Sequence, residues 1–133
     1  MKEFQIINLA ITPEQLYTSA DLNYNDSDSR SIREQRDAAA RPAISGSVEN
    51  MEQYDIVFLG YPIWNGQAPK IISTFLESHD LSGKTIVPFC TSHSSGIGSS
   101  AANLHTLAPG AYWLEVALRK LQTAPLCQLG SMV

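Results

Sequence analysis

Two short segments carry the side chains best suited to holding a small molecule. The first follows the apolar run Ile56–Leu59 and Gly60, and it comprises Tyr61, Pro62, Ile63, Trp64, Asn65 and Gly66. Aromatic rings stack on flat ligands, and an Asn-Gly pair favours a tight turn because both residues tolerate a positive φ. This segment therefore predicts a site for a flat, aromatic ligand.

The second segment is rich in hydroxyl groups and glycine. It follows the run Lys84–Cys90, and its candidate binding residues are Thr91, Ser92, Ser94, Ser95, Gly96 and Gly98. Hydroxyl groups and glycine N–H groups can hydrogen-bond to the polar edge of a flat ligand. His93 lies in the same segment, and we predict that its ring points outward.

These two segments must be brought together by the elements that precede them. Residues 55–60 and 84–90 each read as a strand, and Pro69–Ser78 reads as a helix with its apolar residues at helical spacing. A strand, helix and strand with short connections form a βαβ unit with parallel strands. Both loops are then expected at the same edge of the sheet. Because the run Ile56–Leu59 shows no polar alternation, its strand is predicted to be buried on both faces.

Several long segments of the sequence carry a family resemblance. YDIVFLGYPIW, GQAP, GKTIVPFCTS and SSGIGSSAANL occur in order, and LYTSADLNYND and RPAISGSVENM lie upstream. From about residue 4 to residue 114 the chain resembles the flavodoxin family, in particular its bacterial flavodoxin-like branch. The resemblance implies a three-layer α/β domain, with an open twisted parallel sheet and helices on both faces, that binds one FMN non-covalently.

The resemblance also implies roles for the two loops. Trp64 is expected to stack on the flavin, and the Asn65-Gly66 peptide to turn its C=O toward the flavin N5–H after reduction. The loop that begins at Thr91 is expected to border the pyrimidine edge of the ring. The implied function is electron transfer with redox partner proteins. A carrier is favoured over an enzyme, and an enzyme of this type would be an FMN-dependent oxidoreductase.

Both ends of the chain depart from the family pattern. The strand predicted over Phe4–Leu9 corresponds to the family's second strand, and the T-x-T-x-x-T loop that holds the FMN phosphate is not found in this sequence. Residues 115–133 read as a divergent helix and tail within a single domain, 1–133, in place of a last strand and helix. We expect Phe4–Leu9 either to lie beside the Ile56 strand or to be poorly ordered, and only a short, exposed helix within residues 31–40.

These departures leave a second hypothesis open. The chain would be a truncated flavodoxin-like remnant that binds FMN weakly or not at all and acts as a protein-interaction module. An unpaired sheet edge promotes association, so a homodimer through such an edge is predicted. The missing phosphate loop is the feature that separates the two hypotheses.

Composition and charge exclude several other classes. The chain has 133 residues and a net charge of −4, which argues against a nucleic-acid partner. No run approaches the roughly 20 apolar residues of a membrane span, and the N-terminal residues lack the apolar stretch of a signal peptide, which favours the cytoplasm. Cys90 and Cys127 lack metal or redox spacing and read as structural thiols. His79 and His105 have no ligand partners at metal-binding spacing, so we expect both at the surface and no metal site.

Two rival motifs are weaker. The residues Gly96-Ile97-Gly98-Ser99-Ser100-Ala101 fit the dinucleotide pattern G-x-G-x-x-A after a strand. The loop before Gly96 is too long for that motif's tight turn, however, and no acidic residue lies about twenty positions further on. A serine hydrolase is weaker still, because the sequence has no G-x-S-x-G elbow and no evident His–Asp pair.

Overall fold

The computed structural model describes residues 7, 9–92 and 96–114. Its helices and strands follow one another in the order α1 (Arg30–Arg36), η1 (Met51–Gln53), β1 (Ile56–Pro62), α2 (Lys70–Ser78), β2 (Thr85–Thr91), α3 (Ser100–Leu104), η2 (His105–Leu107) and β3 (Tyr112–Trp113). The strand predicted over Phe4–Leu9 and the helix and tail predicted over 115–133 fall almost entirely outside the described residues.

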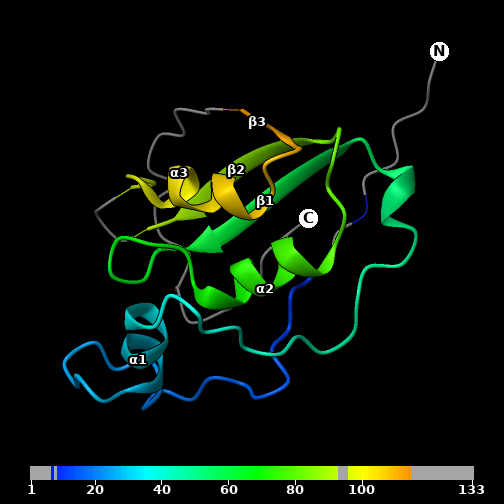
Figure 1. The fold of residues 1–133 in the computed structure, drawn as a ribbon. Coiled ribbons are helices and arrows are strands. Elements are labelled where there is room, and N and C mark those ends of the chain that lie inside the picture. Colours follow the sequence, from blue (N-terminus) through cyan, green and yellow to red (C-terminus); the bar gives the residue numbers. More distant parts are fainter. Residues whose placement is uncertain (1–6, 8, 93–95, 115–133) are drawn as a thin grey trace.

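The three described strands form one parallel sheet in the order β1-β2-β3 (Figure 1). Strand β1 pairs with β2 along its whole length, from Ile56 opposite Thr85 to Pro62 opposite Thr91. The predicted βαβ unit and its parallel strands are confirmed. Strand β1 is longer than expected, because it continues through Tyr61 and Pro62 rather than ending at Gly60. The short strand β3 pairs only with the start of β2.

Helix α2 covers one face of this sheet. Pro69 is its N-cap, and the apolar residues Ile71, Ile72, Phe75 and Leu76 are all buried. They pack in one core with Val57, Leu59 and Ile86, which alternate to the same face of β1 and β2. Leu104 of α3 belongs to this core as well. Burial of the helical stripe against the strand residues is therefore the main apolar contact of the described fold.

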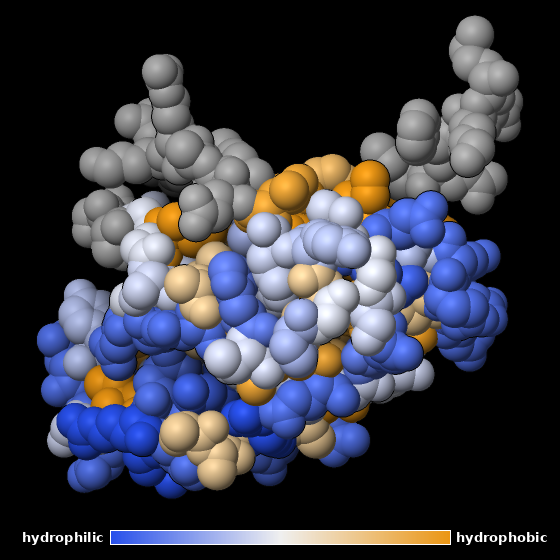
Figure 2. Space-filling model, turned by 45° about the horizontal axis from the view of Figure 1, so that its top comes forward, coloured by the Kyte–Doolittle hydropathy of each residue, from blue (hydrophilic) through white to orange (hydrophobic). Residues whose placement is uncertain are grey.

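The opposite face of the sheet is open among the described residues. Ile56 and Phe58 are each 51% exposed. Tyr112 and Leu114 are largely exposed as well. Figure 2 shows apolar surface along the upper rim of the molecule. The prediction that β1 is buried on both faces is therefore wrong for the described residues. The run is continuously apolar, but only its alternate residues face a helix.

Helix α1 lies apart from the sheet, near the connection between β1 and α2 (Figure 1). It is short, as predicted, but it ends at Arg36 and buries Ser31 and Ile32. The preceding residues 17–28 form turns and loop, as their Asn, Asp and Ser content predicts. Within the described part of the chain, no helix is both long and apolar enough to cross a membrane.

Candidate functional site

The loops that follow β1 and β2 start side by side. Pro62 and Thr91 are the last paired residues of the two strands, and the backbone N–H of Ile63 donates to the carbonyl oxygen of Thr91 at 3.3 Å. The prediction that both loops emerge at the same edge of the sheet is confirmed. In open parallel sheets, this carboxyl edge is where ligands bind.

The first loop is a tight two-residue hairpin. The N–H of Trp64 donates to the carbonyl of Gln67 at 2.8 Å, and the N–H of Gln67 donates back to the carbonyl of Trp64 at 3.1 Å. Asn65 and Gly66 lie between them with φ values of 51° and 77°. The predicted turn with two left-handed residues is confirmed. Both residues are exposed, and open space adjoins Gly66 where a side chain would stand.

Tyr61 has a different position from the rest of that loop. It belongs to β1, only 2% of it is exposed, and its hydroxyl lies 3.0 Å from the hydroxyl of Ser100. Ser100 gives its own proton to the carbonyl of Ile97, so Tyr61 is the donor of the pair. Burial raises the pKa of Tyr61 to about 12, which keeps the hydroxyl protonated at neutral pH. The Tyr61 ring thus joins the strand end to α3 and is not free to stack on a ligand.

The second loop is described at its two ends. Thr91 and Ser92 are half-buried, and the Ser92 hydroxyl accepts a hydrogen bond from the N–H of Gly96 at 2.8 Å. Gly96 and Gly98 have φ values of 69° and 49°, and nothing occupies the space where a Cβ would stand. Ser94 and Ser95, together with His93, lie outside the described residues.

Gln67 ties the hairpin to α3. Its Nε2 donates to the hydroxyl of Ser99 at 3.2 Å, and its Oε1 accepts from the side-chain amide of Asn103 at 2.6 Å. Ser99 is the N-cap residue of α3, the helix that follows the second loop. The structure therefore holds the two loops in a fixed relation through a side chain that the sequence did not single out.

The surroundings of Trp64 contain two residues that sequence reasoning missed. Its half-buried ring meets the ring of Tyr17 edge to face, with centroids 5.1 Å apart, and its carbonyl accepts a hydrogen bond from Gln35 of α1 at 2.8 Å. Both partners are distant in sequence, and neither stands in a recognisable motif. The one signal in the sequence was that Tyr17 is an aromatic residue in an otherwise polar loop.

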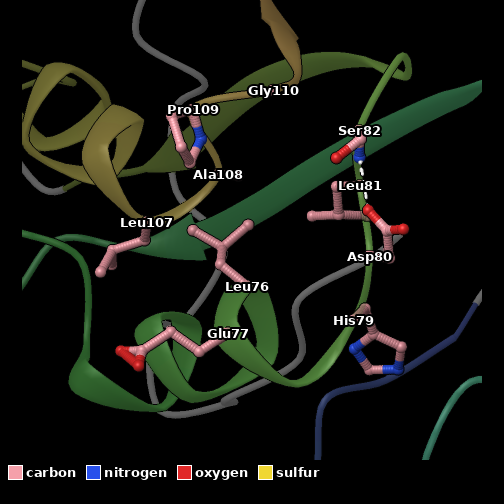
Figure 3. A pocket seen from close by; sticks show the side chains of 10 residues that line it. All are labelled: Leu76, Glu77, His79, Asp80, Leu81, Ser82, Leu107, Ala108, Pro109 and Gly110. Atoms are coloured by element: carbon pink, nitrogen blue, oxygen red, sulfur yellow. Dashed lines mark hydrogen bonds between the residues drawn. The ribbon is translucent and has the colours of Figure 1, made fainter.

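A pocket of about 410 Å³ lies at the other end of the sheet. Figure 3 shows that it is formed by the end of α2, the turn before β2 and the turn before β3; its lining residues are Leu76, Glu77, His79, Asp80, Leu81, Ser82, Leu107, Ala108, Pro109 and Gly110. Two carboxylates stand in this lining, and that of Glu77 pairs with Arg41. Carboxylates repel anionic ligands, and the pocket lies at the amino ends of β2 and β3, so it is a poor site for a phosphorylated cofactor.

The histidines are more buried than predicted. The two ring nitrogens of His79 lie near the carbonyl of Phe75, at 3.0 Å, and the N–H of Val48, at 3.3 Å. Because the Val48 N–H must donate, Nε2 is the acceptor and Nδ1 carries the proton. His105 is half-buried against the ring of Trp113, 4.8 Å away. Both imidazoles are therefore half-buried packing groups that still reach the surface.

The described residues offer binding groups rather than acid–base or metal chemistry. Cys90 is buried at the end of β2, and burial raises the pKa of its thiol. Among the residues that the structure describes, no three metal-ligating side chains gather. What remains at the loop edge is a half-exposed indole, two turns with accessible peptide groups, and hydroxyls. This set suits a flat ring with a polar rim.

Comparison with known proteins gives a consistent picture. The flavodoxin family model matches residues 5–125. The match extends beyond residue 114, near which the resemblance of the sequence motifs ends. A crystal structure of a candidate flavoprotein from Bacteroides eggerthii DSM 20697 is 51% identical, with a TM-score of 0.79 over 86% of this chain and 70% of that one. A candidate flavoprotein from Bacteroides uniformis ATCC 8492 is 44% identical, with a TM-score of 0.75 over 78% of this chain and 67% of that one.

More distant matches agree in fold alone. A flavoprotein from Lactobacillus acidophilus NCFM, crystallised in complex with FMN, is 19% identical, with a TM-score of 0.63 over 79% of this chain and 68% of that one. A search of curated proteins found no match.

Proposed function

This chain belongs to the flavodoxin family, and from that premise we propose that it binds one FMN non-covalently and transfers electrons. The observation that carries the proposal is the meeting of two loops at the carboxyl edge of β1 and β2, with the indole of Trp64 beside an exposed Asn65-Gly66 turn. Bound FMN would supply the one- and two-electron chemistry that the protein side chains lack.

The residues at this edge fit an isoalloxazine ring. Trp64 would stack on one face of the ring, because aromatic pairs gain ~1 kcal/mol beyond burial. The Asn65-Gly66 peptide would meet the ring's edge, since glycine makes a reorientation of that peptide cheap. Thr91, Ser92 and the N–H groups near Gly96 would donate to or accept from the rest of the rim. The Lactobacillus acidophilus flavoprotein, a protein of the same fold, was crystallised in complex with FMN, which supports FMN as the ligand.

The phosphate of FMN has no cationic partner among the described residues of the two loops. The sequence lacks the T-x-T-x-x-T motif, and charge-assisted hydrogen bonds to a phosphate are worth about 1.5–3 kcal/mol each. The two loops must then bind FMN through contacts to the isoalloxazine ring alone. We therefore expect binding in the micromolar range rather than tighter.

The open face of the sheet favours a second candidate function. Its apolar residues Ile56, Phe58 and Tyr112 are exposed among the described residues, and such patches mark interaction sites. If flavin does not bind, the open face of the sheet supports a role in protein interaction. The partner could be a second copy of this chain. In the described sheet, β1 is the longer of the two edge strands and could pair in such a dimer.

A titration with FMN, with riboflavin in parallel, tests the proposal. We expect saturable quenching of flavin fluorescence with both ligands, at dissociation constants that differ by less than about tenfold, because the loops contact the ring and not the phosphate. Much tighter binding of FMN would show that residues outside these loops anchor the phosphate. No quenching by either ligand at high micromolar concentration would contradict the proposed function.

A further inference from the structure

Helix α1 contacts the Trp64 turn through one side chain. The Nε2 group of Gln35 donates to the carbonyl of Trp64 at 2.8 Å and to the carbonyl of Ala68 at 3.3 Å. These two carbonyls stand on either side of the Asn65-Gly66 turn. A single amide group therefore holds both ends of the loop, and only a donor can occupy its position, because both partners are acceptors.

The indole of Trp64 is held from a second direction by Tyr17. The two rings meet edge to face at an interplanar angle of 70°. Tyr17 is itself fixed by α1, because the guanidinium group of Arg30 lies 3.8 Å from the centroid of its ring and its hydroxyl donates to the carboxylate of Glu34. Arg30 also donates to that carboxylate from Nε at 3.0 Å. The position of the Tyr17 ring therefore depends on the helix that carries Gln35.

These contacts order the turn before any ligand is present. The carbonyl oxygen of Trp64 accepts hydrogen bonds from both Gln67 and Gln35. These two bonds fix the orientation of the Trp64-Asn65 peptide, at the start of the turn. The Asn65-Gly66 peptide, in contrast, lies in the exposed part of the turn. Ordering a rotamer-rich side chain or loop costs affinity when it happens on binding, and preorganisation removes that cost.

We propose that Tyr17 and Gln35 are positioning residues that preset the Trp64 indole and its turn for flavin. The inference rests on the proposed function, because it assigns these two residues to the same site. Neither residue needs to touch the flavin. Their role is to hold Trp64 and the flanks of the turn, which leaves the Asn65-Gly66 peptide as the part of the loop that can reorient.

Two disruptive variants, one partial variant and one control test this assignment. Gln35→Glu keeps the size of the side chain but places a carboxylate against two carbonyl oxygens, and Tyr17→Leu removes the ring that contacts Trp64. Tyr17→Phe is the partial variant, because it keeps that ring but loses the hydroxyl that donates to Glu34. Arg33→Ala changes an exposed residue of the same helix and serves as the control for α1 itself.

The first readout needs no flavin. Amide hydrogen exchange of Trp64 and Gln67, which close the turn, is measured in the apoprotein together with amides of the β1–β2 ladder. We expect exchange at the turn to rise about tenfold or more in Gln35→Glu and Tyr17→Leu, with the ladder unchanged. Unchanged exchange at the turn would overturn the inference. Faster exchange in the ladder as well would mean that the contacts support the fold in general, which also overturns it.

The second readout is the dissociation constant of riboflavin. We expect Gln35→Glu and Tyr17→Leu to bind about three- to tenfold more weakly, Tyr17→Phe to bind with an affinity between these and the wild type, and Arg33→Ala to bind as the wild type does. If the wild type binds and both disruptive variants bind equally well, the inference fails and the proposed function stands. If the wild type itself does not bind riboflavin, the proposed function fails, and the inference fails with it.

Discussion

Replacing Trp64 by alanine is expected to weaken flavin binding by roughly 60- to 900-fold. The indole supplies a stacking contribution of ~1 kcal/mol and apolar burial of about 1.5–3 kcal/mol, which together correspond to that range. The fold itself should change little, because Trp64 is half-buried and lies outside the core around α2. The measurement is a fluorescence titration of wild type and Trp64→Ala with FMN.

Two further variants sharpen this result. Trp64→Phe keeps a flat ring and should bind with intermediate affinity. Trp113→Phe changes the other tryptophan, which lies on β3 and bonds to the carbonyl of Ala108, and should bind as the wild type does. Equal affinities for wild type and Trp64→Ala would contradict the assignment of Trp64 as the stacking residue.

Replacing Phe75 by alanine is expected to lower the free energy of unfolding by about 3–5 kcal/mol. Phe75 lies on α2, is 1% exposed and packs between the sheet and the ring of His79. A loss of this size is a large part of the ~5–15 kcal/mol that stabilises an ordinary domain. Urea denaturation followed by circular dichroism measures it.

Phe58→Ala provides the matched comparison, because it removes the same side chain from the open face. Phe58 is 51% exposed, so its truncation should cost only about 1 kcal/mol. A cost for Phe58→Ala as large as that for Phe75→Ala would show that the open face is covered in the folded protein. The one-sided core described above would then be wrong.

The βαβ unit is the part of the fold that local sequence patterns predict well. The apolar residues of α2 recur at helical spacing, Pro69 marks its start, and two β-rich runs flank it. Each of these signals arises within a few residues. Strand β3 has only two residues, Tyr112 and Trp113, which is too short for any periodicity to show.

Burial of β1 could not be read from the chain in the same way. A continuous apolar run is compatible with cover on both faces, but cover is supplied by other elements, and α2 and α3 both pack against the face of Val57 and Leu59. The contacts of Trp64 with Tyr17 and Gln35 were also missed, because polar and aromatic residues in a loop and on a short helix carry no signal of their distant partners. The Asn65-Gly66 turn was predicted because its conformation depends on those two residues alone.

The most direct test of the account is to map where FMN contacts the protein. Backbone amide signals of the isotope-labelled chain are followed by NMR during an FMN titration. We expect the largest shifts in residues 63–67, 91–92 and 96–98, the loops that follow β1 and β2. Shifts centred instead on residues 76–77, 79–82 and 107–110, which line the pocket at the opposite end of the sheet, would contradict it.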